Sequence, residues 1–124
     1  MGGVYMAVWI CERCGNKYSL KLEADFAVDP TRCGKCRLTI ELHTFPLSFS
    51  LKEDLVAWGD DYGKWIDFKC DSLIENGIEL EDEFNKKGIQ LTERVKNELG
   101  EQFTVTFSPS LSAQSYKYKK GLFD

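Results

Sequence analysis

The stretch that decides the fold is CERCGNKYSLKLEADFAVDPTRCGKCR, residues 11–37. It begins and ends with a Cys-x-x-Cys pair, and eighteen residues separate the two pairs. A gap of two residues lets both sulfurs of a pair reach one ion from a tight turn, and two such turns complete a tetrahedron. The sequence therefore predicts one metal site, with the ligands Cys11, Cys14, Cys33 and Cys36.

The residues beside these cysteines also suit metal binding. Gly15 permits a positive φ directly after the first pair. Arg13, Lys35 and Arg37 are close to the cysteines in sequence, and positive charge favours the thiolate form that binds a metal. Four thiolates suit zinc and leave no open position for water or substrate, so we expect one structural Zn²⁺ ion. Iron, which also accepts four thiolates, is the alternative.

The two cysteine turns resemble the zinc knuckles of the zinc ribbons, over residues 8–42. The first turn, Cys11 to Gly15, matches the pattern of that family. In the second turn Arg37 stands where the family often has glycine, and neither turn has the frequent proline. The resemblance implies a structural ion held between short antiparallel strands, with nucleic-acid or protein binding as the usual role.

Alternating apolar residues predict short strands around the cysteines. Apolar and polar residues alternate over 18–22 and over 37–45, a period of two that is typical of a half-buried strand. A third short strand is predicted over 7–10, leading into the first cysteine pair. The sequence Asp-Pro-Thr at 29–31 predicts a turn.

An amphipathic helix is predicted over about 51–68, where apolar residues recur at helical spacing. Ser50 followed by Glu53 is a capping-box pattern at its start. Gly59 and Gly63 weaken this helix. They either line a face where another element packs closely or shorten the helix.

A second helix is predicted over 79–99, and Gly100 suits its C-terminal cap. Gly88 falls on its apolar face and marks either a break or a close contact. A strand is predicted over 103–107, packed on the helices, where it could also extend the sheet by pairing with a ribbon strand. The predicted helical core residues are Leu51, Leu55, Trp58, Tyr62, Phe84, Leu91, Val95 and Leu99.

Together these elements predict an α+β fold. A zinc-ribbon module with short antiparallel strands covers residues 1–45. A module with the two main helices and the C-terminal strand covers 46–107. We expect the polar segment 108–124 to be partly mobile.

The net charge is −4, and it is unevenly distributed. Residues 1–45 carry one net positive charge and residues 46–124 five net negative charges. The acidic part argues against a duplex-binding surface across the whole protein, because duplex affinity comes largely from phosphate neutralisation. No signal peptide or membrane-spanning run is recognisable, so we expect a cytoplasmic protein without membrane contact, where paired cysteines bind metals.

Little in the sequence indicates catalysis, and we assign no catalytic residue. Cys70 has no histidine near it in sequence to activate it, so we expect it to fill space in or near the core. His43 is the only histidine, and we expect it at the surface.

The leading hypothesis is a non-enzymatic module with a structural zinc ion and an acidic surface that binds a protein partner. The alternative is a nucleic-acid-binding regulator that uses the basic ribbon face and the Tyr/Lys-rich tail. A rubredoxin-like iron protein and a small enzyme are further alternatives. The candidate nucleic-acid-binding residues are Arg13, Lys17, Lys35, Arg37, Lys117, Lys119 and Lys120.

Overall fold

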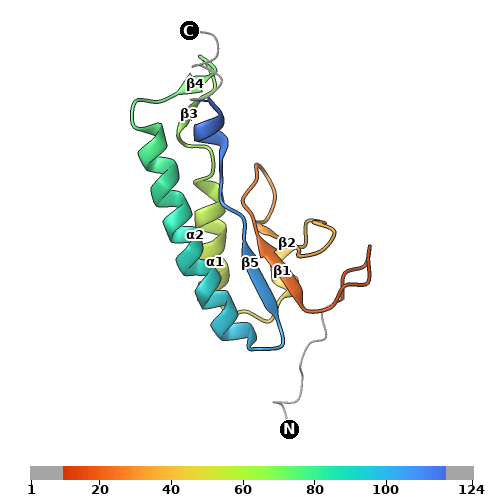
Figure 1. Ribbon diagram of the computed structural model, residues 1–124. Coiled ribbons are helices and arrows are strands. Elements are labelled where there is room, and N and C mark those ends of the chain that lie inside the picture. Colours follow the sequence, from red (N-terminus) through yellow and green to blue (C-terminus); the bar gives the residue numbers. More distant parts are fainter. Residues whose placement is uncertain (1–9, 117–124) are drawn as a thin grey trace.

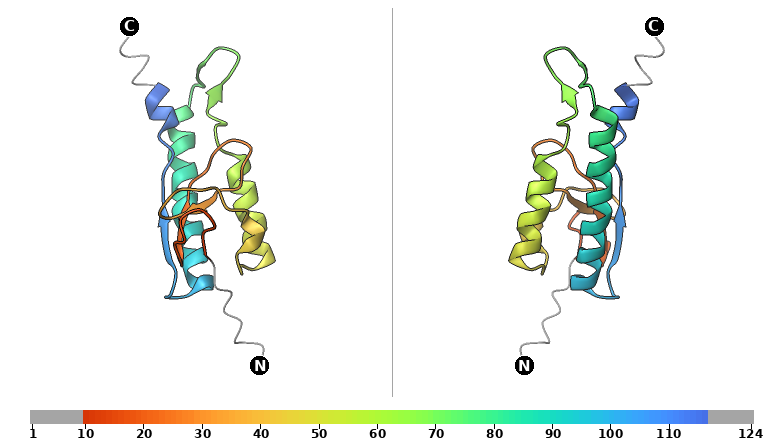
Figure 2. Two further views of the ribbon diagram at one scale, coloured as in Figure 1. Left: turned by 90° about the vertical axis from the view of Figure 1, so that its right-hand side faces the viewer. Right: turned by 90° about the vertical axis from the view of Figure 1, so that its left-hand side faces the viewer.

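A computed structural model describes residues 10–116 and has an α+β fold, as predicted (Figure 1). Two long antiparallel helices lie side by side, and a three-stranded sheet lies along them (Figures 1 and 2). A two-stranded hairpin connects the helices at one end. In chain order the elements are β1 (Ser19–Leu22), β2 (Thr31–Cys33), the 3-10 helix η2 (Leu42–Thr44), α1 (Phe49–Asp60), β3 (Ile66–Asp67), β4 (Ser72–Leu73), α2 (Gly77–Leu99), β5 (Thr104–Phe107) and a short helix at 112–116.

The sheet pairs a strand near the start of the described chain with a strand near its end. Its strand order is β2-β1-β5, with β1 antiparallel to β2 and parallel to β5. Ser19 pairs with Thr104, which confirms that the C-terminal strand extends the ribbon strands into one sheet. Leu20 and Leu22 of β1 are fully buried, so the predicted alternation over 18–22 places apolar side chains in the core.

Helix α1 is shorter than predicted at its C-terminal end. Its N-cap is Ser48, whose Oγ accepts a hydrogen bond from the Leu51 amide at 3.2 Å, so the predicted capping box at Ser50 is wrong. The helix ends at Asp60 rather than near residue 68. Gly63 has φ +84°, a left-handed conformation that turns the chain toward β3.

Helix α2 runs without a break over Gly77–Leu99, and Gly100 caps it with φ +87°. Gly88 marks a close contact. A Cβ atom at this position would lie 2.6 Å from Phe107 Cζ and 2.7 Å from Trp58 Cζ2. Because Gly88 has no side chain, β5 and α1 can pack directly on the backbone of α2.

The core lies between the helices and the sheet. Every predicted helical core residue is buried except Tyr62, which is partly buried. The Trp58 ring stacks on Phe84 at 4.5 Å, and its Nε1 donates a hydrogen bond to the Phe84 carbonyl at 2.9 Å. Within the described residues, no helix has the length and apolar character needed to cross a membrane.

The predicted strand over 37–45 is wrong. Within it only Thr39 forms a bridge pair, and Leu42–Thr44 forms a short 3-10 helix. The Asp29 carboxylate accepts a hydrogen bond from the first amide of this helix at 2.8 Å, which fixes the turn. The place beside β1 is taken by β2, whose first residue was predicted to be part of a turn.

A buried carboxylate holds the segment that follows β5. Glu81 of α2 is 2% exposed and accepts hydrogen bonds from Ser110 Oγ at 2.7 Å and the Ala113 amide at 2.9 Å. It thereby caps the helix at 112–116, and Trp65 Nε1 donates to Ser112 Oγ at 2.9 Å beside it. Residues 7–9 of the first predicted strand and residues 117–124 of the predicted mobile segment lie outside the described residues.

A glycine-to-alanine pair tests the packing of α2. We expect Gly88→Ala to lower the free energy of unfolding by about 1–3 kcal/mol, because buried rings must move to admit the methyl group. We expect Gly59→Ala in α1 to raise the free energy of unfolding by about 0.4–1 kcal/mol, because alanine lowers the conformational entropy of the unfolded chain. The folded state has room for the new Cβ, which would meet Pro30 at an ordinary 3.6 Å. Urea unfolding followed by circular dichroism measures both. A gain in stability for both variants would contradict the close contact at Gly88.

Candidate metal centre

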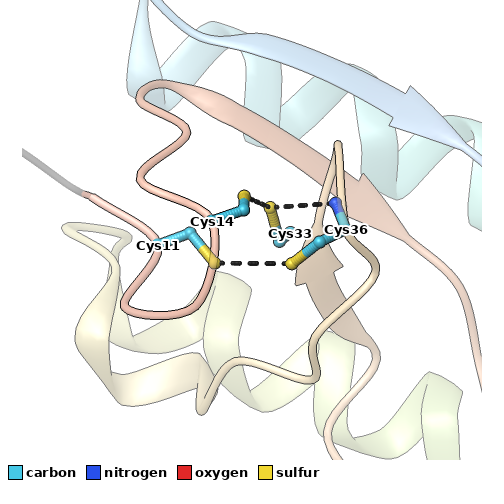
Figure 3. A group of neighbouring side chains, drawn as sticks. All are labelled: Cys11, Cys14, Cys33 and Cys36. Atoms are coloured by element: carbon cyan, nitrogen blue, oxygen red, sulfur yellow. Dashed lines mark hydrogen bonds between the residues drawn. The ribbon is translucent and has the colours of Figure 1, made fainter.

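The first cysteine pair lies in a turn whose two sides are held together. Ile10 and Lys17 form an antiparallel bridge pair at its base. The Gly15 amide donates to the Cys11 carbonyl at 2.9 Å, and the Cys11 amide donates to the Asn16 carbonyl at 2.9 Å. This short knuckle aims its two sulfurs at the second pair (Figure 3).

The second pair begins at the end of β2 with Cys33 and continues into a turn with Cys36. The Gly34 amide donates to the Ser19 carbonyl at 2.9 Å, which packs this turn against β1. A Cβ atom at Gly34 would lie 3.0 Å from the Ser19 carbonyl carbon, so only glycine fits here without movement. The central strand of the sheet thus positions the second pair.

Arg37 occupies the position where the zinc-ribbon pattern often has glycine, and it takes the conformation that glycine would take. Its φ is +67°, close to the +75° of Gly15 at the matching place in the first turn. The Arg37 guanidinium forms an ion pair with Glu23 at 2.6 Å. The departure from the family pattern therefore leaves the shape of the turn intact.

The two turns bring all four predicted ligands together. Their sulfur atoms lie within 4.8 Å of one another, and all four cysteines are free. The Cys11 and Cys36 sulfurs are 3.6 Å apart, and those of Cys14 and Cys33 are 3.7 Å apart (Figure 3). A tetrahedron of thiolates with metal–sulfur bonds of about 2.3 Å separates its sulfurs by about 3.8 Å. The cluster could therefore hold one metal ion.

Hydrogen bonds to sulfur make the cluster electrostatically uneven. Burial raises the pKa of the Cys33 thiol, but the backbone amides of Cys36 and Lys35 and the neighbouring thiols outweigh burial and lower this pKa to about 6. The Leu38 amide lowers the pKa of Cys36, whereas burial and the three other thiols raise it, for a net pKa of about 11. One thiolate is thus stabilised by the protein itself, and a cation would be needed to keep all four ionised.

The predicted nucleic-acid-binding residues stay a prediction. Arg13, Lys17 and Lys35 are exposed on the cysteine turns, and the exposed Arg37 is paired with Glu23. The last three candidates, Lys117, Lys119 and Lys120, lie outside the described residues.

The fifth cysteine and the histidine are both exposed and lie outside the cysteine cluster. Cys70 is exposed, so the prediction that it fills the core is wrong. It lies in the turn between β3 and β4, where the Asp67 carboxylate accepts a hydrogen bond from the Cys70 amide at 3.3 Å. His43 is at the surface, as predicted, with 73% of its side chain exposed.

Sequence patterns did not indicate a groove that lies beside helix α1. The groove has a volume of about 750 Å³ and lies between residues 25–29 and the C-terminal end of α1. Its walls come from three separate segments of the chain, so no local pattern could indicate it. Phe26 and Asp60 are among the residues that line it.

One protein family matches most of the chain. Its description is Serratia CdiI immunity protein-like, and the match covers residues 18–110. This range contains both helices and all strands of the sheet, and it includes Cys33 and Cys36. It begins after Cys11 and Cys14. The four-cysteine cluster is consistent with the predicted zinc-ribbon-like site, but the matching family is not a zinc-ribbon family.

Comparison of the sequence with curated proteins gave no match. The family match, in contrast, spans well over half of the chain and the whole three-stranded sheet. The chain therefore belongs to the Serratia CdiI immunity protein-like family.

Proposed function

We propose that this chain is an immunity protein, which binds a toxin protein and blocks its action. The observation that carries the proposal is the family match over residues 18–110. Binding alone can block a toxin if the complex covers the surface that the toxin needs for its own activity. The proposal agrees with the protein-binding hypothesis drawn from the sequence.

The surface of the chain supports this role. Phe49, Phe68 and Phe26 are 75%, 67% and 48% exposed, and aromatic side chains are enriched in protein interfaces. The net charge of −4 would speed association with a basic partner through long-range attraction.

Zinc is the ion that we propose for the cysteine cluster, and its role is structural. The sulfur distances of 3.6 and 3.7 Å suit a tetrahedral zinc site, and four thiolates close the coordination shell. The ion would tie the first knuckle, outside the family match, to the sheet inside it. A reducing cytoplasm would keep the four thiols free for the metal.

Toxin neutralisation tests the immunity proposal. A cell that makes a toxin needs its immunity protein at the same time, so the product of the gene adjacent to that for this chain is the first candidate to test as the toxin. We expect co-expression of this chain to restore growth to cells that produce the toxin. We also expect the two purified proteins to form a complex with a nanomolar Kd, measured by isothermal titration calorimetry.

A second, unrelated toxin serves as the control and should remain lethal in the same assay. If the neighbouring toxin kills cells despite the folded chain, and the purified proteins do not bind, the immunity proposal is wrong.

Metal analysis with two cysteine variants tests the zinc proposal. We expect about one zinc per chain in freshly purified protein. Cys33→Ser should lose most of the zinc and about 3 kcal/mol or more of stability, because the bound ion stabilises only the folded state. Elemental analysis and chemical unfolding measure the two effects.

Cys70→Ser is the matched control, since Cys70 is exposed and lies outside the cluster. It should keep both the zinc and the stability of the wild type. Stoichiometric iron in place of zinc would support the rubredoxin-like alternative, and fresh protein without any bound metal would contradict a metal site.

A further inference from the structure

The groove beside α1 combines exposed aromatic and aliphatic side chains with a concave shape. Its volume is about 750 Å³, and its apolar lining residues include Phe26, Val28 and Tyr62. Phe26 is 48% exposed and Val28 is 43% exposed, so apolar surface remains open to water on the loop that forms one wall. In Figure 2 this loop lies beside the C-terminal end of α1.

The exposed Phe26 ring is held in place by its neighbours. Its ring centroid lies 4.6 Å from that of Tyr62 and 5.8 Å from that of Phe68, both with edge-on geometry. The ring also lies over Gly63, where a Cβ atom would be 2.7 Å from Phe26 Cζ. An aromatic ring that is both exposed and fixed loses little entropy on binding, which is typical of interface hot spots.

The polar lining of the groove is acidic. Asp25, Asp29, Glu41 and Asp60 line it, and no lysine or arginine among residues 10–116 does. Asp25 forms an ion pair with Arg32 at 3.0 Å. The Asp29 carboxylate accepts a hydrogen bond from the Leu42 amide at the start of η2. Glu41 lies 3.2 Å from His43, and Asp60 forms no salt bridge within residues 10–116. The groove therefore keeps a net negative charge around its apolar wall.

We propose that this groove is the docking site for the toxin, and that it accepts a basic segment of that protein. Lysine or arginine side chains of the segment would face Asp60 and Glu41, and an apolar side chain would pack on Phe26. Charge complementarity of this kind raises the rate of association and sets the orientation of the partner. The inference rests on the proposed immunity function and names the surface that carries it.

Charge reversal in the groove tests the inference with the toxin that the wild type neutralises. Asp60 and Glu41 are both exposed, and the Glu41 side chain makes no capping hydrogen bond to η2, so the double variant Asp60→Lys/Glu41→Lys should fold normally. The matched control is Glu79→Lys/Glu93→Lys on α2, which contributes no residue to the groove. Both variants change the net charge equally, so a difference between them reports position rather than total charge.

We expect the groove variant to raise the Kd by about tenfold or more, and the control to stay within about threefold of the wild type. Phe26→Ala should also raise the Kd by about tenfold, and this loss should persist at high salt because it is apolar. Thermal unfolding of each variant verifies that the fold is retained.

Three outcomes distinguish a failure of the proposed docking site from a failure of the proposed immunity function. Loss of binding in the groove variants alone supports the docking site. If the wild type binds and the folded groove variants bind equally well, the groove is not the site and the immunity function stands. If the folded wild type binds no toxin, the immunity function falls and the docking site falls with it.

Discussion

At Gly88 the backbone of α2 meets the rings of Trp58 and Phe107 directly, and this contact sets the spacing of the whole fold. Trp58 belongs to α1 and Phe107 to β5, so three elements meet at a position without a side chain. The stacking of Trp58 on Phe84 locks the two helices together in the same place. Once β5 is fixed there, β1 can pair with it. This pairing attaches the two cysteine turns, which adjoin β1 and β2, to the helices.

Sequence patterns predicted the parts of the fold that depend on local chemistry. The extent of α2, its glycine cap at Gly100 and the strand over 103–107 follow from periodicity and backbone preference. The end of α1 did not follow, because apolar residues continue at helical spacing past Gly63 and are used instead in the turn toward β3. The strand predicted over 37–45 failed for a similar reason, since tertiary contacts and not alternation decided which segment lies beside β1.

The candidate sites divide in the same way. The cluster of four cysteines could be predicted, because the spacing within each pair is a local requirement of metal binding. The acidic groove could not, because Phe26, Glu41 and Asp60 are brought together only by the packing of a loop on α1. The family match explains the body of the protein and leaves Cys11 and Cys14 outside it. The cysteine cluster thus brings a segment outside the family match together with a segment within it.

The parallel pairing of β1 with β5 also constrains the order in which the fold can form. Residues 19 and 104 must meet before the sheet is complete, so the contact closes a loop that contains most of the described chain. Contacts between such distant residues form slowly, because the loop between them must lose entropy first. During synthesis β1 is made before β5, so the central strand waits for this partner while the segment between them is made. Until β5 arrives, one edge of β1 stays unpaired, and an open strand edge is a place where another chain can pair and aggregate.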